Sequence, residues 1–485
     1  MSSQTKADRQ YSEKILSVFH FFEDICSIPH PSYHEEKIAD YLCAFAADRG
    51  LECYRDHLHN VLIKKPATPD KKDVAPLLFQ GHTDMVCVKT ADSTIDFMKD
   101  GLELYLDGDL LRAKGTTLGA DDGIAVATML ALLDGELSSH PALECLFTAA
   151  EEVGLDGAEG FDYSKISARK MINMDSEDLG IVTAGCAGGL RSTLTKTCKR
   201  VPVTGECLKI SLQGLFGGHS GVDICSGRAN ANKLMGRLLA KWQKDEGEAR
   251  LVSLNGGSKD NAIPSICEAV IVTADAEKTT ALIEQTAAEI AAELAGDDKG
   301  FFVTVTPTEA PEGMFSAIDT AQLIAILATV DNGVKEMNYN IKTLPEWSRN
   351  LGVITTTGDE IEFVFSSRSA IESRLDASID ELDTLARITG CVTKHYSRYP
   401  GWDYAPVSPL RDLYLRAYRE VTGKDAIVDV IHAGLECGII ASKLPGLDVI
   451  SVGPDMRDVH TPDERLNLSS VETFWKTIEK LVELM

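Results

Sequence analysis

A histidine and an aspartate, His82 and Asp84, stand two positions apart where an apolar run ends. The run itself, residues 77–80, carries no charge and stops at Gly81, a pattern typical of a buried strand in a parallel sheet. Ligand sites in open α/β sheets lie beyond the carboxyl ends of such strands. Residues i and i+2 share a face of an extended chain, so Asp84 could fix the tautomer of His82 for a metal. The alternative is a His-x-Asp in a surface turn.

Further acidic residues and a second histidine follow other predicted strands and loops: Asp121, Glu151, Glu152, Asp175 and His460. Two imidazoles with carboxylates and no thiolate suit one or two catalytic Zn²⁺, or Mn²⁺ or Co²⁺, rather than a structural cysteine site. Two metals need a shared carboxylate, and an aspartate in a tight loop, such as Asp121, fits that role. A hydrolase also needs a free carboxylate to take a proton from water. The adjacent Glu151 and Glu152 offer one ligand and one base, and their spacing does not show which is which.

Each of these residues also has a purely structural interpretation. Asp121 could be an acid favoured at a helix N-terminus, Asp175 could belong to a solvated acidic turn, and His460 could be a turn histidine. A lone histidine such as His432 is more often structural than catalytic. The joint pattern favours a metal site, because the acids and histidines follow strands one after another on a fold whose sites form there.

Three buried strands are expected to position these residues, at 77–82, 143–148 and 170–174. Helices are expected between and before them. One covers 11–28, and a second opens with a capping box formed by Ser32 and Glu35. This alternation of strands and helices predicts a doubly wound α/β sheet.

From about residue 190 the sequence changes to the pattern of an α+β domain. Strands are expected at 208–213, 268–272, 302–305, 352–356 and 361–365, and helices at 229–244, 279–294, 319–330 and 377–388. The α/β alternation returns from residue 405. We therefore predict a catalytic domain made of residues 11–189 and 403–485, with an inserted domain over 190–402.

The composition excludes several classes of protein. With 485 residues the chain is too long for one ordinary domain. A net charge of −26 argues against nucleic acid and anionic membrane surfaces as partners. The 12 cysteines contain no C-x-x-C pair, which suits a reducing compartment. Residues 1–10 are polar, and no apolar stretch has the length of a membrane span, so we expect a cytoplasmic protein.

Several motifs together resemble those of the co-catalytic di-zinc peptidase family of aminoacylases, glutamate carboxypeptidases and dipeptidases. They are Gly81-His82-Thr83-Asp84-Met85-Val86, Gly119-Ala120-Asp121-Asp122-Gly123, Glu151-Glu152-Val153-Gly154, Asn173-Met174-Asp175-Ser176-Glu177, Gly217-Gly218-His219-Ser220-Gly221 and His432-Ala433-Gly434-Leu435-Glu436-Cys437-Gly438. The similarity runs from about residue 12 to the end. Residues 28–36 and 116–121 are similar to the branch that cleaves aminoacyl-histidine dipeptides. One departure is that Thr-Thr-Leu is added before Gly119 and that Gly123 replaces the family's usual lysine, which weakens a deacetylase reading.

The resemblance implies a role for each candidate residue of the catalytic domain. His82, Asp121 and Asp175 would hold one metal. Asp121, Glu152 and His460 would hold the other. Glu151 would be the general base and Asp84 would orient His82.

In this family the inserted domain acts as a lid and a dimerisation surface. The resemblance implies that His219, often of the partner subunit, stabilises the oxyanion. Asn261 and Arg368 would bind substrate, with Arg368 on the C-terminal carboxylate of a dipeptide. A salt-bridged surface arginine is the alternative for Arg368. His432 and Glu436 resemble substrate-side residues.

The fold class implied is a doubly wound zinc-peptidase catalytic domain with an inserted α+β lid and dimerisation domain. The function implied is hydrolysis of dipeptides, preferentially of Xaa-His type, by a metal-activated water, in a homodimer with two Zn²⁺. Two alternatives stay open. One is an N-acyl amino acid amidohydrolase of the same family, and the other is an inactive binding protein. The presence of all five ligands and of Glu151 argues against the latter.

Overall fold

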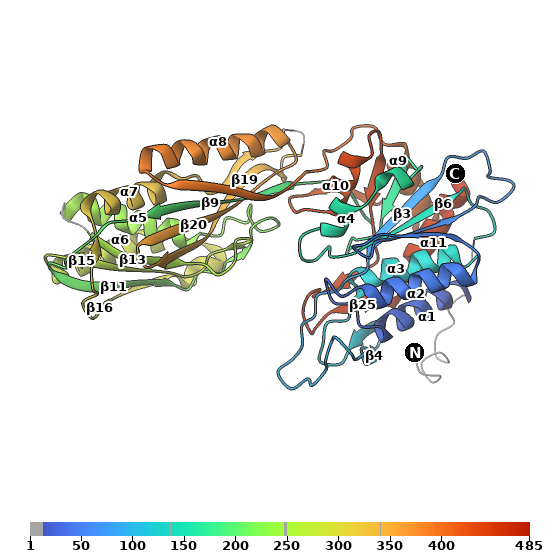
Figure 1. Ribbon diagram of the computed structural model, residues 1–485, viewed down its shortest axis with the longest axis horizontal. Coiled ribbons are helices and arrows are strands. Elements are labelled where there is room, and N and C mark those ends of the chain that lie inside the picture. Colours follow the sequence, from blue (N-terminus) through green and yellow to red (C-terminus); the bar gives the residue numbers. More distant parts are fainter. Residues whose placement is uncertain (1–12, 136, 247–249, 340) are drawn as a thin grey trace. The chain divides into compact units, whose positions relative to one another are not determined.

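The computed structural model describes residues 13–135, 137–246, 250–339 and 341–485. The start of the first predicted helix, at residues 11 and 12, lies outside the described residues. The chain divides into two compact units (Figure 1). The first unit contains the residues up to Cys186, Trp402–Val430 and Leu435–Met485, and the second contains Ala187–Gly401 and Ile431–Gly434.

The first unit is built on an eight-stranded mixed sheet with the order β1-β2-β6-β3-β7-β23-β8-β22. The strands are β1 (Glu52–Arg55), β2 (Val61–Lys65), β3 (Leu77–His82), β6 (Leu143–Thr148), β7 (Lys170–Asn173), β8 (Ile181–Cys186), β22 (Ile427–Ile431) and β23 (Asp448–Ser451). β3 runs parallel to both β6 and β7, and β7 runs parallel to β23. The predicted parallel strands therefore form the centre of the sheet, and their carboxyl ends share one edge.

Helices cover both faces of this sheet (Figure 1). α1 (Glu13–Ser27), α2 (Glu36–Asp48), α3 (Ala120–Leu133), α9 (Pro409–Thr422) and α11 (Leu468–Leu484) share one hydrophobic core. Leu77 and Phe79 of β3 point into that core. The next residue, Gln80, instead contacts Glu436 at the start of α10 (Glu436–Lys443), on the face where α4 (Asp156–Gly160) also lies. This alternation along β3 is what a sheet covered on both faces requires, and it confirms the doubly wound fold class.

A small four-stranded sheet completes the first unit. Its order is β24-β25-β5-β4, with β4 (Leu104–Asp107), β5 (Leu110–Ala113), β24 (Met456–Arg457) and β25 (Arg465–Asn467). A single-turn 3₁₀ helix, η1, covers Tyr163–Lys165. β4 and β5 form a hairpin. The loop between β24 and β25 carries His460.

The second unit is a nine-stranded sheet in which all recorded strand pairs are antiparallel. Its order is β16-β11-β15-β13-β19-β20-β9-β21, with β18 beside β19. The strands are β9 (Gly188–Thr197), β11 (Glu206–Gln213), β13 (Arg250–Gly256), β15 (Cys267–Thr273), β16 (Phe302–Pro307), β18 (Gly333–Met337), β19 (Pro345–Thr357), β20 (Glu360–Ser369) and β21 (Val392–Tyr399).

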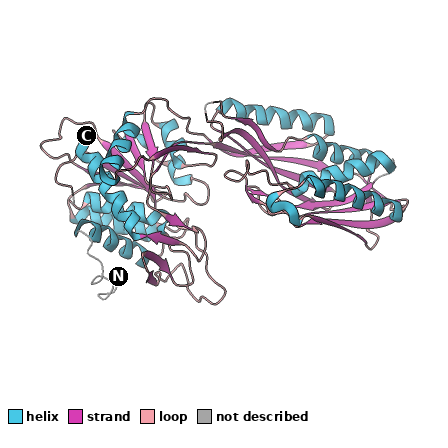
Figure 2. Cartoon of the chain, turned by 180° about the vertical axis from the view of Figure 1, so that it is seen from behind, coloured by secondary structure: helices cyan, strands magenta, loops and turns pink. Residues whose placement is uncertain are grey.

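Four long helices pack with this sheet in one hydrophobic core (Figure 2). They are α5 (Ala231–Glu246), α6 (Ala276–Glu293), α7 (Ala317–Thr329) and α8 (Glu372–Thr389). The remaining elements are the pair β10 (Arg200–Val201) and β17 (Met314–Phe315), the pair β12 (Gly218–His219) and β14 (Ala262–Ile263), and the 3₁₀ helix η2 (Gly296–Gly300). No helix among the described residues is long and apolar enough to span a membrane, and all 12 cysteines are free thiols.

Candidate metal and catalytic site

The carboxyl ends of β3, β6 and β7 meet at one edge of the first unit's sheet. β3 ends at His82, which lies opposite Thr148 at the end of β6. The loop after β6 carries Glu151 and Glu152, and Asp175 follows β7. Because parallel strands end at the same edge, side chains that are distant in sequence come together there.

Asp121, at the start of α3, lies between the two histidines. Its Oδ1 is 3.2 Å from Nε2 of His82, and its Oδ2 is 3.1 Å from Nε2 of His460. Glu152 Oε1 is 2.8 Å from the same nitrogen of His460, and Asp175 Oδ1 is 4.0 Å from Nε2 of His82. Each carboxylate oxygen of Asp121 thus faces a different imidazole, which is the arrangement that a ligand shared by two metals needs.

The donor atoms form sets compact enough to hold metal ions. In each of three sets the donor atoms lie within 4.8 Å of one another: His82, Asp121 and Asp175; Asp121, Glu152 and His460; and His82, Glu151 and Glu152. The first two sets share Asp121, and all three combine imidazole nitrogen with carboxylate oxygen. This chemistry fits Zn²⁺ and similar divalent ions.

The electrostatics of the cluster reflect its excess of acid. Hydrogen bonds to Asp121 and Glu152 raise the pKa of His460 to about 11. Burial lowers the pKa of His82, but the carboxylates of Asp121 and Asp84 outweigh burial and leave this pKa well above its usual value. Burial raises the pKa of Glu151 well above its usual value, and the charges of Asp175 and Glu152 add to this. Crowded carboxylates at one edge favour a bound cation.

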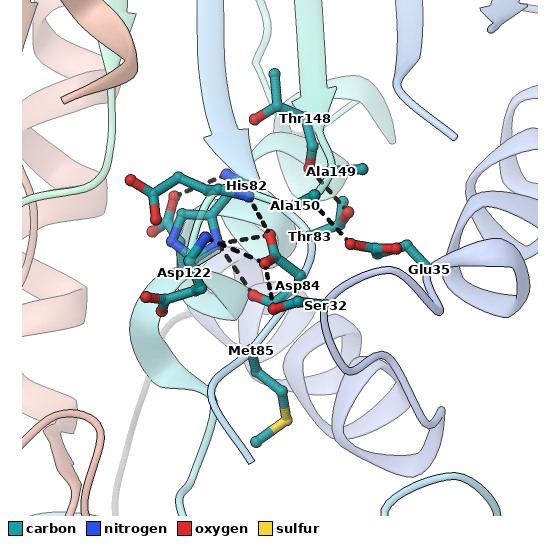
Figure 3. Close-up of polar contacts among 12 residues, drawn as sticks. Ser32, Glu35, His82, Thr83, Asp84, Met85, Asp122, Thr148, Ala149 and Ala150 are labelled. Carbon is teal, nitrogen blue, oxygen red and sulfur yellow. Dashed lines mark hydrogen bonds and ion pairs between the residues drawn. The ribbon is translucent and has the colours of Figure 1, made fainter. Parts of the chain in front are cut away.

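Asp84 ties the end of β3 to the loop that carries the two glutamates (Figure 3). Its Oδ1 accepts the N–H of Glu151 at 3.0 Å, and its Oδ2 accepts the N–H of Glu152 at 3.2 Å and the hydroxyl of Ser32 at 2.7 Å. Nδ1 of His82 is 3.0 Å from the main-chain oxygen of Asp84 and 3.5 Å from its carboxylate. Asp84 therefore contacts His82 mainly through its backbone and holds the glutamate loop through its side chain.

The expected capping box at Ser32 and Glu35 is wrong. α2 begins at Glu36 without a side-chain cap, and the hydroxyl of Ser32 donates to Asp84. The buried carboxylate of Glu35 accepts the N–H of Ala150 at 2.9 Å, one residue before the glutamate pair (Figure 3). Both side chains make long-range contacts that support the site, and the local contact of Glu35, which accepts the N–H of Tyr33 at 3.0 Å, is not a capping box.

The backbone at the end of β3 lies close to the side chain of Asp122 in α3. Oδ2 of Asp122 accepts the N–H of His82 at 3.2 Å. A Cβ added at Gly81 would lie 2.5 Å from that same carboxylate oxygen and 2.8 Å from Cβ of Ala125. Glycine is therefore required at position 81, because any side chain would separate α3, and with it Asp121, from the end of β3.

Glu436 is fully buried on the other face of the sheet from α3. Its Oε2 accepts hydrogen bonds from the amide of Gln80 and from the hydroxyl of Thr148, the latter at 2.7 Å. Among the described residues Oε1 has no hydrogen-bond partner. Burial raises the pKa of Glu436 to about 7.

His219, the expected oxyanion donor, and Asn261, an expected substrate-binding residue, neighbour each other in the second unit. β12 pairs with β14, and the main-chain oxygen of Asn261 accepts the N–H of Ser220 at 2.8 Å, next to His219. Nδ1 of His219 accepts the N–H groups of Gly221 and Val222, each at 3.3 Å. The proton of the neutral ring is therefore on Nε2, and this nitrogen is a donor.

Arg368 and His432 belong to the same region of the second unit. A guanidinium nitrogen of Arg368 donates to the hydroxyl of Tyr399 at 3.0 Å, and no carboxylate within the described ranges pairs with it, so the salt-bridged surface arginine is not what the structure shows. Burial and the charge of Arg368 lower the pKa of His219, and the same causes lower that of His432 to about 3. Nε2 of His432 is 2.7 Å from the hydroxyl of Ser348.

Glu464 is not among the residues predicted from the sequence, yet its buried carboxylate accepts N–H groups from residues 118–121. It follows His460 by four positions, beside the equally acidic Asp463. No local signal separates the two acids, because only the fold brings one of them to the loop before α3.

Comparisons with known proteins identify relatives of this chain. The model of the family described as "Peptidase family M20/M25/M40" matches residues 78–484. A cytosol non-specific dipeptidase from Escherichia coli (strain K12) is 39% identical over 466 residues, which cover 95% of this chain and 96% of that protein. The crystal structure of an aminoacylhistidine dipeptidase from Vibrio alginolyticus has a TM-score of 0.89 at 35% identity and covers 98% of both chains. An aminopeptidase structure from Bacillus cereus, at 16% identity and a TM-score of 0.56 with 97% of this chain and 98% of that chain covered, shares the fold.

Proposed function

This chain belongs to peptidase family M20/M25/M40, and from that premise we propose that it is a metal-dependent hydrolase of dipeptides, with a preference for the Xaa-His type. The placement of Asp121 between two imidazoles, beside a pair of glutamates, carries the proposal. The named activities of the Escherichia coli and Vibrio alginolyticus relatives support the substrate class.

His82, Asp121 and Asp175 hold one metal ion in this proposal, and Asp121, Glu152 and His460 hold a second. Zn²⁺ is the proposed metal because the donors are imidazole and carboxylate, and Co²⁺ or Mn²⁺ could replace it. Bound there, the ions would supply Lewis-acid polarisation of the peptide carbonyl and lower the pKa of the attacking water.

Glu151 is the proposed general base. Its carboxylate is next to the ligand cluster, and burial together with neighbouring acids raises its pKa well above the usual range. A carboxylate with a raised pKa both takes a proton and gives it up readily near neutral pH. Glu151 thus takes the proton from the attacking water and passes it to the leaving amine when the C–N bond breaks.

The second unit is proposed to supply substrate recognition as a lid and dimerisation domain, in a homodimer. The Nε2–H of His219 suits donation to an oxyanion, because its Nδ1 accepts two backbone N–H groups and its pKa is lowered. Arg368 suits the C-terminal carboxylate of a dipeptide, because no carboxylate of the described chain neutralises it. Asn261, His432 and Glu436 complete the proposed substrate-side set.

We further propose a cytoplasmic location, and partners limited to small dipeptides, without nucleic acid or membrane. The name of the Escherichia coli relative, a cytosol dipeptidase, supports the location. The free thiols and the net charge of −26 agree with it.

Release of free amino acids from a dipeptide panel, Xaa-His included, tests the activity. We compare wild type with Glu151→Gln and Glu152→Gln and measure the metal content of all three. We expect wild type to cleave dipeptides, Glu151→Gln to keep its metal but lose at least about 10²-fold in kcat, and Glu152→Gln to lose metal. A fully metallated wild type that cleaves N-acetyl-His but no dipeptide would identify an N-acyl amino acid amidohydrolase instead.

A further inference from the structure

One buried carboxylate accepts the backbone N–H groups of four consecutive residues in the first unit. Oε2 of Glu464 lies 2.7 Å from the nitrogen of Leu118 and 3.1 Å from that of Gly119. Oε1 lies 2.8 Å from the nitrogen of Ala120 and 3.4 Å from that of Asp121. Glu464 is 2% exposed, so no water replaces these contacts.

These N–H groups belong to the segment that leads into the regular part of α3. α3 spans Ala120–Leu133, but Asp121 and Asp122 have non-helical backbone angles, so the regular helix begins after them. Gly119 precedes the helix in the left-handed conformation, with φ of 66°, and offers no side chain as a cap. A carboxylate from elsewhere in the chain satisfies these buried backbone donors, which would otherwise lack a partner. The conformation of the segment that ends in Asp121 therefore depends on Glu464.

The same carboxylate links this segment to the loop of His460. His460 and Glu464 both lie between β24 and β25, and the N–H of Glu464 closes a turn onto the oxygen of Thr461 at 3.1 Å. β25 is in turn anchored to β5 through the pairing of Leu466 with Leu111. The side chain of Glu464 thus joins two segments that are 343–346 positions apart in the sequence. One segment carries Asp121 and the other carries His460, and these two side chains face each other.

We propose that Glu464 is a positioning residue of the metal centre, which sets the orientation of Asp121 relative to His460 before metal binds. The inference rests on the proposed function, since it assumes that Asp121 and His460 are ligands. Groups that orient metal ligands in this way raise affinity, and their loss typically weakens metal binding about 10–100-fold.

Glu464→Gln tests the proposal, because glutamine has the same shape but presents an NH₂ group where Glu464 presents an acceptor. Glu144→Gln is a matched control. The carboxylate of Glu144 is also buried, and it accepts the N–H groups of Ser167 and Ala168 and the hydroxyl of Ser167. That segment carries no proposed ligand, so the control reports the general cost of altering a buried carboxylate.

The main measurement is metal affinity, from competition of each apo-protein with a chromophoric chelator for Zn²⁺, together with the visible spectrum of the Co²⁺ form. We expect Zn²⁺ to bind about 10–100-fold more weakly to Glu464→Gln, with a changed Co²⁺ spectrum, and Glu144→Gln to match wild type in both. Equal affinity and spectra in Glu464→Gln and wild type would overturn the inference alone. Failure of wild type to bind any metal would instead overturn the proposed function.

A measurement on wild type keeps the test decisive if Glu464→Gln does not fold. Hydrogen exchange of the peptide that covers residues 118–121 is followed in the apo-protein and in the Zn²⁺-loaded protein. We expect slow exchange in both forms, since the carboxylate holds these N–H groups without metal. Fast exchange in the apo-protein, slowed only by Zn²⁺, would show that the metal and not Glu464 orders the segment.

Discussion

The ring of His219 illustrates how main-chain contacts set the chemistry of a side chain. Two backbone N–H groups occupy its Nδ1 and leave Nε2–H as the donor. Burial and the charge of Arg368 lower its pKa, so the ring stays neutral at physiological pH. A neutral donor stabilises developing negative charge without taking part in proton transfer.

We expect His219→Ala to lower kcat for dipeptides about 10²–10³-fold with a smaller change in KM, because an oxyanion donor acts in the transition state. Steady-state kinetics with one good dipeptide measures this. His395→Ala is the control in the same unit, since His395 hydrogen-bonds to Ser192 and Asp383 but has no proposed role. An unchanged kcat in His219→Ala would contradict the proposed role of His219 as an oxyanion donor.

The ring of His432 should remain neutral at pH values far below the usual titration range of histidine. Burial and the charge of Arg368 lower its pKa to about 3, whereas a histidine in the unfolded chain has a pKa of about 6.5. The unfolded state therefore binds more protons in this window. Stability contributed by neutral His432 is complete above about pH 6.5 and is lost as the pH falls toward the folded pKa.

We expect the ring signal of His432 in NMR spectra of ¹³C-histidine-labelled protein to stay at its neutral position from pH 8 to pH 5. The spectrum of His432→Gln assigns the signal by its disappearance. A midpoint for His432 between pH 6 and 7 would contradict the expected burial of this ring beside Arg368.

At the scale of elements, the end of β21 positions a side chain at the end of β20. The ring of Tyr399 lies against two glycines: a Cβ at Gly189 would be 2.3 Å from its Cζ, and one at Gly434 would be 2.7 Å from its Cε2. Its hydroxyl accepts from Arg368. The two glycines, one in β9 and one in the loop after β22, thus leave a space without side chains that holds the tyrosine ring and, through it, the arginine.

We expect Tyr399→Phe to raise KM for dipeptides up to about tenfold, the cost of one hydrogen bond to a charged group, with little change in kcat. The same dipeptides with an amide in place of the C-terminal carboxylate provide the control. If Tyr399 acts through Arg368 on that carboxylate, the amide substrates lose nothing. An equal loss for acids and amides would indicate a general disturbance of the unit.

Elements with regular apolar spacing were predictable, and those set by tertiary contacts were not. The strands β3, β6 and β7 follow from apolar runs, and the helices α5, α6, α7 and α8 follow from helical spacing. β9 was missed because its Gly, Ser and Thr residues resemble a loop, although the strand pairs with both β20 and β21 and most of it is buried. β13, β18 and β21 were missed as well.

The candidate site shows the same division. Strand ends and residue types predicted which acids and histidines gather, because topology alone brings the ends of parallel strands together. The supporting contacts were not predictable in the same way. Ser32 and Glu35 fit a local capping pattern but form contacts with Asp84 and Ala150. Glu464 accepts hydrogen bonds from residues far away in the sequence, and no sequence pattern indicates such a contact.

On the scale of the whole molecule, the two units have separate hydrophobic cores. All proposed metal ligands belong to the first unit. A ligand that binds only the folded state raises its free energy of unfolding by RT ln(1 + [L]/Kd). This stabilisation applies to the unit that binds the ligand.

We expect removal of metal with a chelator to abolish activity and to lower the unfolding temperature of the first unit, while the second unit keeps its own. At a free Zn²⁺ concentration of about 100 Kd the difference is about 2.7 kcal/mol. Calorimetry measures the transitions, and hydrogen exchange of peptides from each unit assigns them. Added Zn²⁺ should restore both activity and temperature. Equal destabilisation of both units would contradict this separation.

The position of β23 in the sheet has a consequence for biosynthesis. β23 lies between β7 and β8, yet its residues follow both by more than 200 positions. A ribosome makes β7 and β8 first, then the whole of Ala187–Gly401, and only later the strand that belongs between them. Until Asp448–Ser451 emerges, the nascent chain carries open strand edges at the centre of its future sheet. Residues Ala187–Gly401, which make up most of the second unit, are complete during that interval, whereas the first unit must wait, and a centre for which His460 is a proposed ligand cannot form before that residue is made.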